Sequence, residues 1–256
     1  MTKIILDLCN NHMGHRRILD SLIEHSKTSG DYVKFQLYNP ERLNKEYPGY
    51  EGYKKMCEEY QITDELLQHI LNQFTFITLK PMFTIFSEDR LDFLYKNLNE
   101  VEFLKNWPTQ FALKIGSPDM SNYSLIDKCI DMFPDNLLVI STGMHTDSEI
   151  VSCMQRYKDK AKFLHCISEY PTHPEDVDFS KIQDMDGFSD HSKGIEIAKR
   201  CIDIGTEYYE CHFTLSKNLP GKDHSVSKDV DEVYRIANYK QSKMNAEQYK
   251  KRWSNG

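Results

Sequence analysis

Short apolar segments alternate along this chain with longer segments in which apolar residues recur every three or four positions. The short segments are rich in β-branched and aromatic residues and end at polar or glycine positions, a pattern typical of buried strands. We predict eight strands, at Ile4–Leu8, Tyr32–Phe35, Phe76–Thr84, Phe111–Gly116, Leu137–Ser141, Phe163–Cys166, Gly187–Ser189 and Tyr208–Cys211.

The longer segments have the spacing of amphipathic helices. Two of them follow a threonine that we expect to act as an N-cap, Thr63 and Thr146. The predicted helices are Arg16–Ser26, Asp64–Phe74, Glu88–Leu98, Leu125–Met132, Asp147–Tyr157 and Ile195–Ile204, with a short helical turn at Phe179–Asp184.

Alternation of eight strands with helices predicts an α/β fold, a TIM (β/α)8 barrel. An open doubly wound sheet is the alternative. The sequence has neither a G-x-G-x-x-G after the first strand nor a G-x-x-x-x-G-K-[ST] anywhere, so the usual nucleotide markers of open sheets are missing. We expect the barrel to cover residues 1–235 and a Lys-rich helical tail to cover 236–256.

The segment Leu37–Ile62 is longer than a usual strand-to-helix connection. A long loop at the carboxyl end of a barrel strand is either a lid or substrate wall, or a surface excursion packed by its own aromatic residues. The sequence favours neither reading. The segment carries five tyrosines, Tyr38, Tyr47, Tyr50, Tyr53 and Tyr60.

Polar side chains gather at the carboxyl ends of the predicted strands, which meet at the face where barrel active sites lie. Lys34 and Lys114 lie within strands, where a buried ammonium needs an anionic partner. That partner is an internal carboxylate, Asp7 or Glu210, or a bound anion. Because hydroxyl groups end the neighbouring strands, we favour an anionic substrate. The other strand-end candidates are Asn11, Gln36, Thr84, Ser117, Asp119, Ser141, Ser168 and Ser189.

His191 and His212 stand at the ends of the last two predicted strands. A strand–helix–strand crossover places both at one face, where two imidazoles can share a divalent metal. The pattern alone favours two ordinary histidines, but the lysines and hydroxyls on the same face favour the metal pair. Cys211 precedes His212 and should point to the opposite face as a buried thiol. His12 is either functional or braces the first turn.

The 256-residue chain carries a net charge of −7 and has no basic stripe, which argues against nucleic-acid binding. No apolar run approaches membrane-spanning length, and no signal peptide is recognisable. Seven cysteines are present, an odd number without C-x-x-C spacing. We therefore expect free thiols in a reducing, cytoplasmic compartment and no membrane partner.

Several stretches together resemble the sialic acid synthase family, which includes the legionaminic and pseudaminic acid synthases. They occur in family order from residue 4 to about residue 230. The combination of SDH, HFT and PGxDH is the most specific part. The stretches are NHMG, VKFQ, LKIGSPDMSNYSLI, ISTGM, LHCISEYPTHPEDVDF, GFSDHSKGI and ECHFTLSKNLPGKDHSVS.

The resemblance implies a TIM barrel that condenses phosphoenolpyruvate with an N-acylated hexosamine of the N-acetylmannosamine type. The product is a nonulosonic acid, and phosphate is released. His191 and His212 would hold a divalent metal, Mn²⁺ in the first place, and Asp119 would handle a water or proton step. Asp7 and Asp223 would face the sugar. Lys34, Lys114, Ser117, Ser141 and Ser189 would hold the phosphate and carboxylate, with Thr84 and Ser168 nearby.

Four features depart from the family pattern. Asp7 and Asp119 stand where glutamate is usual, Ser168 where asparagine is common, and Pro118 where glycine is common. The chain ends near residue 256, before the antifreeze-like domain that caps the neighbouring subunit's sugar site in the family. We therefore expect the cap to be missing, and a homodimer or a separate cap-domain protein to be the partner.

Two other readings remain. One is a non-catalytic relative that binds the sugar or phosphoenolpyruvate, or assembles with a full synthase. The other is a different carbon–carbon-forming barrel, including an aldolase with a Schiff-base lysine.

Overall fold

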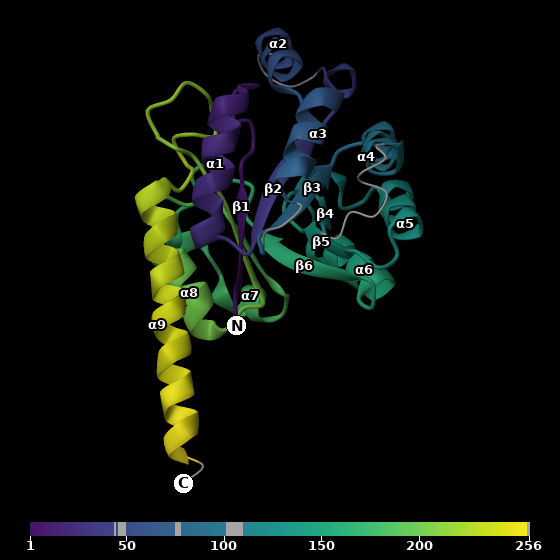
Figure 1. Cartoon of the computed structure of the whole chain (residues 1–256). Coiled ribbons are helices and arrows are strands. Elements are labelled where there is room, and N and C mark those ends of the chain that lie inside the picture. The colour runs from purple at the N-terminus through teal and green to yellow at the C-terminus, as the bar shows by residue number, and fades with distance from the viewer. Residues whose placement is uncertain (44, 46–49, 75–77, 101–109, 255–256) are drawn as a thin grey trace.

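The computed structural model describes the chain except for residues 44, 46–49, 75–77, 101–109 and 255–256. Eight parallel strands follow one another around a closed barrel, with the last paired to the first (Figure 1). This confirms the predicted TIM barrel and rules out the open sheet. The strands are β1 (Lys3–Asp7), β2 (Tyr32–Leu37), β3 (Lys80–Ile85), β4 (Ala112–Ile115), β5 (Leu137–Ser141), β6 (Ala161–Cys166), β7 (Gly187–Asp190) and β8 (Tyr208–His212).

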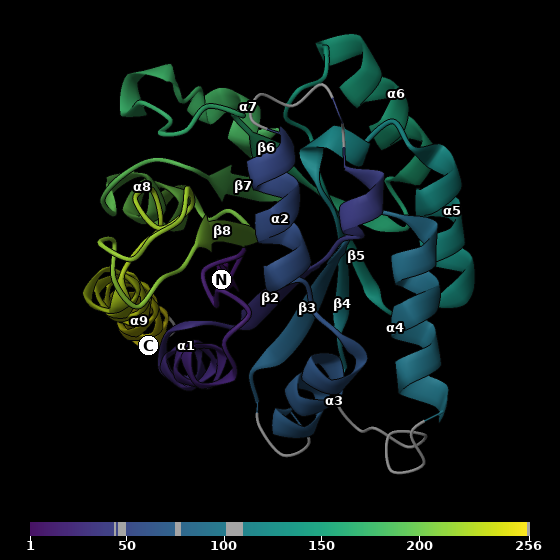
Figure 2. The same cartoon turned by 90° about the horizontal axis from the view of Figure 1, so that it is seen from above.

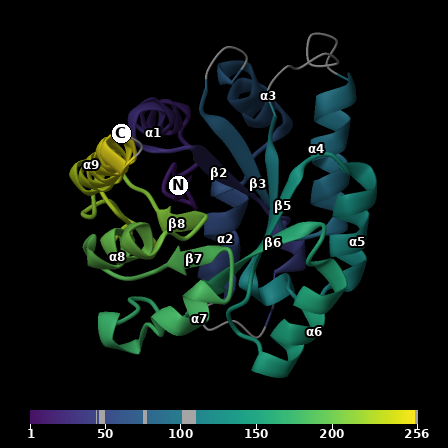
Figure 3. The same ribbon diagram turned by 90° about the horizontal axis from the view of Figure 1, so that it is seen from below.

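Helices surround the barrel on its outside, as the view from below shows (Figure 3). Short 3₁₀ turns η1 (Pro40–Arg42), η3 (Ser117–Asp119) and η4 (Pro174–Asp176) lie in the connecting loops. The helices are α1 (Arg16–Ser29), α2 (Tyr50–Tyr60), α3 (Asp64–Gln73), α4 (Glu88–Glu100), α5 (Tyr123–Met132), α6 (Asp147–Tyr157), α7 (Phe179–Gln183), α8 (Glu196–Ile204) and α9 (Val230–Ser254).

The predicted elements are present with small shifts at their ends. The predicted start of the third strand, Phe76, lies outside the described residues, and β3 begins at Lys80. Both threonine caps are confirmed, since the Thr63 side chain accepts a hydrogen bond from the Leu66 N–H and Thr146 forms a capping box with Glu149.

Helix α2 was not predicted, although it belongs to the long segment after β2. Its sequence gives a weak apolar period, because Cys57 is the one fully buried side chain among its described residues. Seen from above, α2 lies across the mouth of the barrel (Figure 2). Tyr53 and Tyr60 line the cavity beneath it, which favours the substrate-wall reading of this segment. Tyr47 lies outside the described residues.

The barrel interior has an apolar floor and a polar layer above it. Side chains two positions apart on a strand face the same way, and most floor residues are followed by a polar one. Tyr32 precedes Lys34, Ala112 precedes Lys114, and Tyr208 precedes Glu210. The floor consists of Ile5, Tyr32, Met82, Ala112, Val139, Leu164 and Tyr208. A separate, larger core fills the space between the strands and the helices, and Cys211 belongs to it, as predicted.

Gly187 on β7 allows the backbones of β7 and β8 to approach closely. A Cβ atom at this position would lie 1.9 Å from the carbonyl oxygen of Tyr208. Gly187→Ala is therefore expected to lower the free energy of unfolding by about 1–3 kcal/mol, measured by urea denaturation. Gly52→Ala is the matched control, since nothing lies within 4 Å of its Cβ position. In helix α2 this change should raise stability by roughly 1 kcal/mol, and equal effects at both positions would contradict the prediction.

Helix α9 packs against α1 and α8 at its N-terminal end and then extends past the barrel (Figure 1). Val233 and Ile236 are buried in the outer core. The helix begins at Val230 and so crosses the predicted domain division between residues 235 and 236, which stays a prediction. None of the described helices combines the length and the apolar character needed to cross a membrane.

Candidate active site

A cavity of about 510 Å³ opens at the carboxyl ends of the strands. The predicted site residues come from every strand or the loop that follows it, and the structure brings all but Asp119 to this one cavity. Those that line it are Asp7, Asn11, Lys34, Gln36, Thr84, Lys114, Ser117, Ser141, Ser168, Ser189, His191, His212 and Asp223.

Lys34 lies at the centre of a buried charge network. Its ammonium is 2.8 Å from Asp7 Oδ2 and 3.6 Å from Glu210 Oε1, and it donates to Thr84 Oγ1 at 3.1 Å. Burial opposes the charge of Lys34, but Asp7 and Glu210 outweigh it and raise its pKa. Lys34 therefore already has an internal carboxylate partner, the first of the two alternatives that the sequence left open.

Lys114 is less well compensated. Its ammonium donates to Ser141 Oγ and, at 3.2 Å, to the carbonyl of Ile115, while Glu210 Oε1 is 3.9 Å away. Burial lowers its pKa, and Glu210 offsets this only in part. A further negative charge beside Lys114 would therefore be stabilised. Of the two buried ammonium groups, that of Lys114 has the more distant carboxylate partner, 3.9 Å against 2.8 Å for Lys34.

Glu210 joins the two lysines and was not among the predicted site residues. Its Oε1 accepts from Ser189 Oγ at 2.8 Å, while its buried Oε2 has no hydrogen-bond partner among the described residues. Burial opposes its ionisation, but Lys114 and Lys34 outweigh this and lower its pKa. The two-residue period from Tyr208 to His212 is the signal that could have identified Glu210 as a third inward-facing residue of β8.

Gly143 lies where two cavity hydroxyls meet. A Cβ atom there would be 2.9 Å from Ser117 Oγ and 2.5 Å from Ser168 Oγ. Because Gly143 has no side chain, the hydroxyls of Ser117 and Ser168, from the loops after β4 and β6, can both lie next to its Cα. Hydroxyl donors arranged in this way suit phosphate or carboxylate oxygens.

His191 and His212 face one another, with ring centroids 4.9 Å apart. The His191 Nδ1 lies 3.0 Å from the carbonyl of Ile167, which can only accept, so the proton is on Nδ1. In the neutral ring its Nε2 carries the lone pair, and the Tyr170 hydroxyl lies 3.0 Å from it. Burial opposes the charged form of His191, but the hydrogen bonds with Cys166 and the Ile167 carbonyl outweigh it and raise its pKa. Burial lowers the pKa of His212, which favours the neutral, metal-binding form. Its buried Nδ1 has no hydrogen-bond partner among the residues described.

Lys228 holds the two histidine segments together from behind the cavity. Its backbone N–H donates to the carbonyl of His212 at 2.8 Å. Its ammonium is 3.1 Å from Asp190 Oδ2 and donates to the carbonyl of Ser192 at 2.5 Å, so it binds the residues on either side of His191. The spacing of the histidines is thus fixed by a fully buried ion pair.

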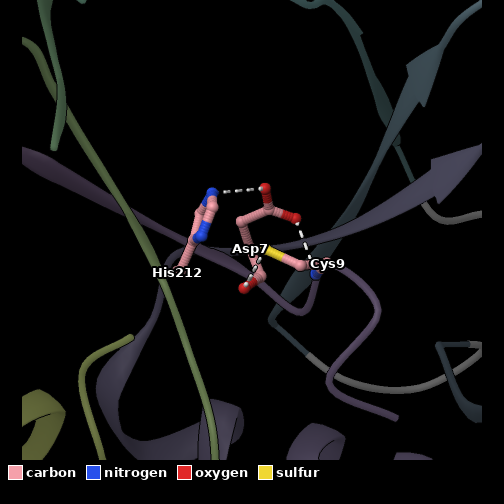
Figure 4. A group of neighbouring side chains, drawn as sticks. All are labelled: Asp7, Cys9 and His212. Carbon is pink, nitrogen blue, oxygen red and sulfur yellow. Dashed lines mark hydrogen bonds and ion pairs between the residues drawn. The ribbon is translucent and has the colours of Figure 1, made fainter. Parts of the chain in front are cut away.

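Two chemically different groups, those of Asp7 and Cys9, lie beside His212 (Figure 4). Ligand atoms of Asp7, Cys9 and His212 all lie within 4.8 Å of one another, and all three residues are buried. Cys9 has a φ of 45°, in the left-handed region, which costs a residue with a side chain roughly 1–2 kcal/mol. Cys9 was not predicted as a site residue, because a cysteine in the loop after β1 does not by itself indicate a role. The group has the donor types of a divalent-metal site.

Asp119 does not line the cavity, although Ser117 and Pro118 before it do. It ends the η3 turn and is half-buried. Burial raises the pKa of its carboxyl to about 6, and a hydrogen bond from Asn122 and the charge of His145 offset this in part. Its predicted catalytic role stays a prediction.

Two further polar residues have structural contacts. The Asn11 amide nitrogen donates to the carbonyl of Phe213 at 2.8 Å and to Ser227 Oγ at 2.9 Å, so it also ties the loop after β1 to the loop after β8. His12 braces the first turn, because its Nδ1 accepts from the Gly14 N–H at 3.1 Å. Burial lowers the pKa of His12 to about 4.

Comparisons with known proteins cover most of the chain. A family model described as the NeuB family matches residues 22–251. An N-acetylneuraminate-9-phosphate synthase of Drosophila melanogaster is 29% identical over 252 residues, which cover 90% of this chain and 64% of that protein. An N,N'-diacetyllegionaminic acid synthase of Legionella pneumophila is 30% identical over 261 residues, covering 90% and 68%. The chain thus spans about two thirds of the length of these relatives.

The fold is also that of a solved structure. An N-acetylneuraminic acid synthetase of Leptospira borgpetersenii, in complex with citrate, superposes with a TM-score of 0.81 at 24% identity. The match covers 100% of this chain and 92% of that one, so the whole described barrel has its counterpart there.

Proposed function

The chain belongs to the NeuB family, and from that premise we propose that it condenses phosphoenolpyruvate with an N-acylated hexosamine, releasing phosphate and a nonulosonic acid. The observation that carries the proposal is the division of one cavity into two adjoining parts. Lys114, Ser117 and Ser141 offer an anion subsite at its base, and His191 and His212 offer a metal subsite beside it.

The anion subsite suits phosphoenolpyruvate, which carries a phosphate and a carboxylate. The under-compensated ammonium of Lys114 would bind one of these groups, and the hydroxyls that meet at Gly143 would donate to its oxygens. Lys34 and Glu210 fix the position of the neighbouring charges through their ion pair. The enol carbon would then be held still while it attacks the sugar.

The residues at the metal subsite fit a divalent ion. His191 presents the Nε2 lone pair, His212 has a buried Nδ1 without a partner among the described residues, and Asp7 adds a carboxylate. Mn²⁺ is the ion that the resemblance implies. When bound, it would supply Lewis-acid polarisation of the sugar's carbonyl. The chain's own part is to hold the imidazoles in the correct tautomer, through Ile167, and at a fixed spacing, through Lys228.

Asp119 is proposed as the group that moves a proton or orients water, at the rim of the anion subsite. Asp119→Asn should lower kcat by about 10²–10⁴-fold and remove a limb of the pH–rate profile near the carboxyl pKa of about 6. Asp119→Glu reaches one methylene further and should retain activity. Unchanged kcat in Asp119→Asn would show that the role belongs elsewhere.

The direct test of the reaction is phosphate release from phosphoenolpyruvate with Mn²⁺ and a panel of N-acylated hexosamines, including N-acetylmannosamine. The acidic sugar product should appear by mass spectrometry in step with phosphate. Binding of phosphoenolpyruvate without turnover on any sugar would count against the proposal.

That outcome would favour a second candidate, a non-catalytic relative that binds the same ligands. The place of Asp119 outside the lining motivates it. It predicts that phosphoenolpyruvate binding, measured by calorimetry, survives His191→Ala and that no sugar is converted. A loss of measured turnover in His191→Ala would exclude it.

Two wider proposals accompany the reaction. All seven cysteines are buried and unpaired with one another, which supports a reducing, cytoplasmic setting. The mouth of the cavity carries the exposed or half-exposed residues Lys222 and Asp223, which supports a homodimer or a separate cap-domain protein as the cover of the sugar side. Light scattering after gel filtration separates these two arrangements.

A further inference from the structure

The cavity is charged at its base and largely apolar at its mouth. The base is formed by strand residues, among them Lys34, Lys114 and Glu210. The lining above the strands comes from helix α2, which lies across the mouth, and from the loops that follow the strands (Figure 2). Five aromatic or thioether side chains of this upper lining form what we call the mouth wall: Tyr53, Met56, Tyr60, Phe86 and Met144.

Met144 presents its apolar side chain at the mouth from a strained backbone. The residue is 70% exposed, although it lines the cavity. Its φ of 67° lies in the left-handed region, which a residue with a side chain seldom adopts. Phe86 is held in place by Tyr38, whose ring lies edge-on to it with centroids 6.4 Å apart. Strain that keeps an apolar side chain exposed beside other apolar groups indicates a surface that contacts a ligand.

The mouth offers little positive charge. Among the described residues, Lys34, Lys114 and Lys222 are the lysines that line the cavity, and no arginine lines it. Lys34 and Lys114 lie at the base, where they would face phosphoenolpyruvate. The Lys222 ammonium lies 5.6 Å from the ring centroid of Tyr53, and the adjacent Asp223 adds a negative charge to the same loop. A phosphate group at the mouth, with its charge of about −2, would therefore lack matching cations.

The proposed reaction determines which end of the sugar contacts the mouth wall. The sugar's carbonyl carbon must meet the enol carbon of phosphoenolpyruvate at the base, so the carbons furthest from the carbonyl lie at the mouth. We propose that the mouth wall selects an acceptor sugar whose far end is unphosphorylated and carries an apolar substituent, such as the methyl of a second N-acyl group. This inference rests on the proposed function and names the substrate class of the same site.

The physical reason for this preference is burial. A methyl group that leaves water for thioether and aromatic surface is stabilised, and one such group in an apolar pocket changes specificity by roughly 10–200-fold. A phosphate in the same place would lose its water without gaining ionic partners. We therefore expect a second N-acyl group to improve binding by about tenfold or more, and a phosphate to weaken it by about tenfold or more.

Three sugars of one configuration test the assignment: N-acetylmannosamine, its 6-phosphate and its 4-acetamido-4-deoxy derivative. Their binding to the full-length protein with Mn²⁺ is measured by calorimetry without phosphoenolpyruvate, and kcat/KM is measured with it. The 4-acetamido sugar should bind most tightly and the 6-phosphate most weakly. Tighter binding of the 6-phosphate than of both other sugars would overturn the assignment, as would equal binding of all three.

Met144→Lys tests the mouth wall itself. The new ammonium should reduce the preference for the 4-acetamido sugar over the 6-phosphate by about tenfold or more, and Met144→Leu should keep that preference. Because Met144 is exposed, both variants should fold. Val151→Lys is the matched control, since Val151 is 51% exposed and does not line the cavity. The same preference in Met144→Lys as in wild type would refute the role of the wall.

Binding and turnover together separate this inference from the function on which it rests. A wild-type protein that releases phosphate fastest with the 6-phosphate sugar would confirm the reaction and refute the selection by the mouth wall. A protein that converts none of the sugars, yet binds the 4-acetamido sugar most tightly, would do the reverse.

Discussion

Replacing His212 with alanine is expected to lower kcat for phosphate release by about 10³-fold or more. The loss of a metal ligand removes several kcal/mol of transition-state stabilisation, and each 1.36 kcal/mol corresponds to about tenfold in rate. The side chain is buried between Asp7 and His191, so no neighbouring group of the cavity replaces it without a shift. Steady-state kinetics and the affinity for the divalent ion, measured by calorimetry, should fall together.

His165→Ala is the control for this result. His165 also lies on a barrel strand, but it faces outward, with its ring centroid 5.8 Å from that of Phe188, and it does not line the cavity. It should change kcat little. A His212→Ala protein that keeps both its fold, by circular dichroism, and its activity would refute the metal subsite.

Replacing Lys34 with methionine should cost about 3–5 kcal/mol of unfolding free energy. The substitution leaves Asp7 and Glu210 buried beside one another without the ammonium that lies 2.8 Å and 3.6 Å from them. Burial opposes ionisation of Asp7, but Lys34 and His212 outweigh it and hold its pKa well below its usual range. This stabilisation is present above about pH 4 and is lost as the pH falls towards the folded-state pKa.

The pH dependence separates a charge effect from a packing effect. Without Lys34, burial raises the pKa of Asp7, so the stability gap between variant and wild type should narrow as the pH falls towards about 4. Lys162→Met is the matched control, since Lys162 also has two carboxylate partners, Asp186 and Glu207, but its side chain is 38% exposed. It should cost no more than about 1 kcal/mol. A gap that does not change with pH would show that Lys34 acts through packing alone.

The fold was predictable because each strand and most helices carry a period of their own. Once the strands are placed, the period of two also sends Lys34 and Lys114 into the barrel, which is why separate segments of the sequence could be assigned to one site. The same rule places Glu210, which the sequence suggested only as a possible partner of the lysines, among the inward-facing residues. The period of two does not give the distances between side chains on different strands. The carboxylate partners of the two lysines could therefore only be named as alternatives.

The features that the sequence did not predict lie in segments without a regular spacing of apolar residues. Helix α2 buries little apolar surface, and it contacts a loop distant in sequence, where the Lys222 ammonium lies over the ring of Tyr53. Asp119 follows Pro118 in a 3₁₀ turn, whose exit direction sequence does not fix. The left-handed backbone at Cys9 is likewise a property of the folded loop, because a cysteine in a sequence gives no signal of positive φ.

The apolar floor of the barrel has a consequence for the order of events. Among the described residues it closes one end, and the cavity that Lys114 lines at 1% exposure is bordered at its other end by α2 and the loop of Asp223. A small anion must therefore arrive at the base before a larger sugar fills the space above it. In the proposed reaction this geometry gives compulsory-order kinetics, with phosphoenolpyruvate first, and makes an excess of the sugar an inhibitor.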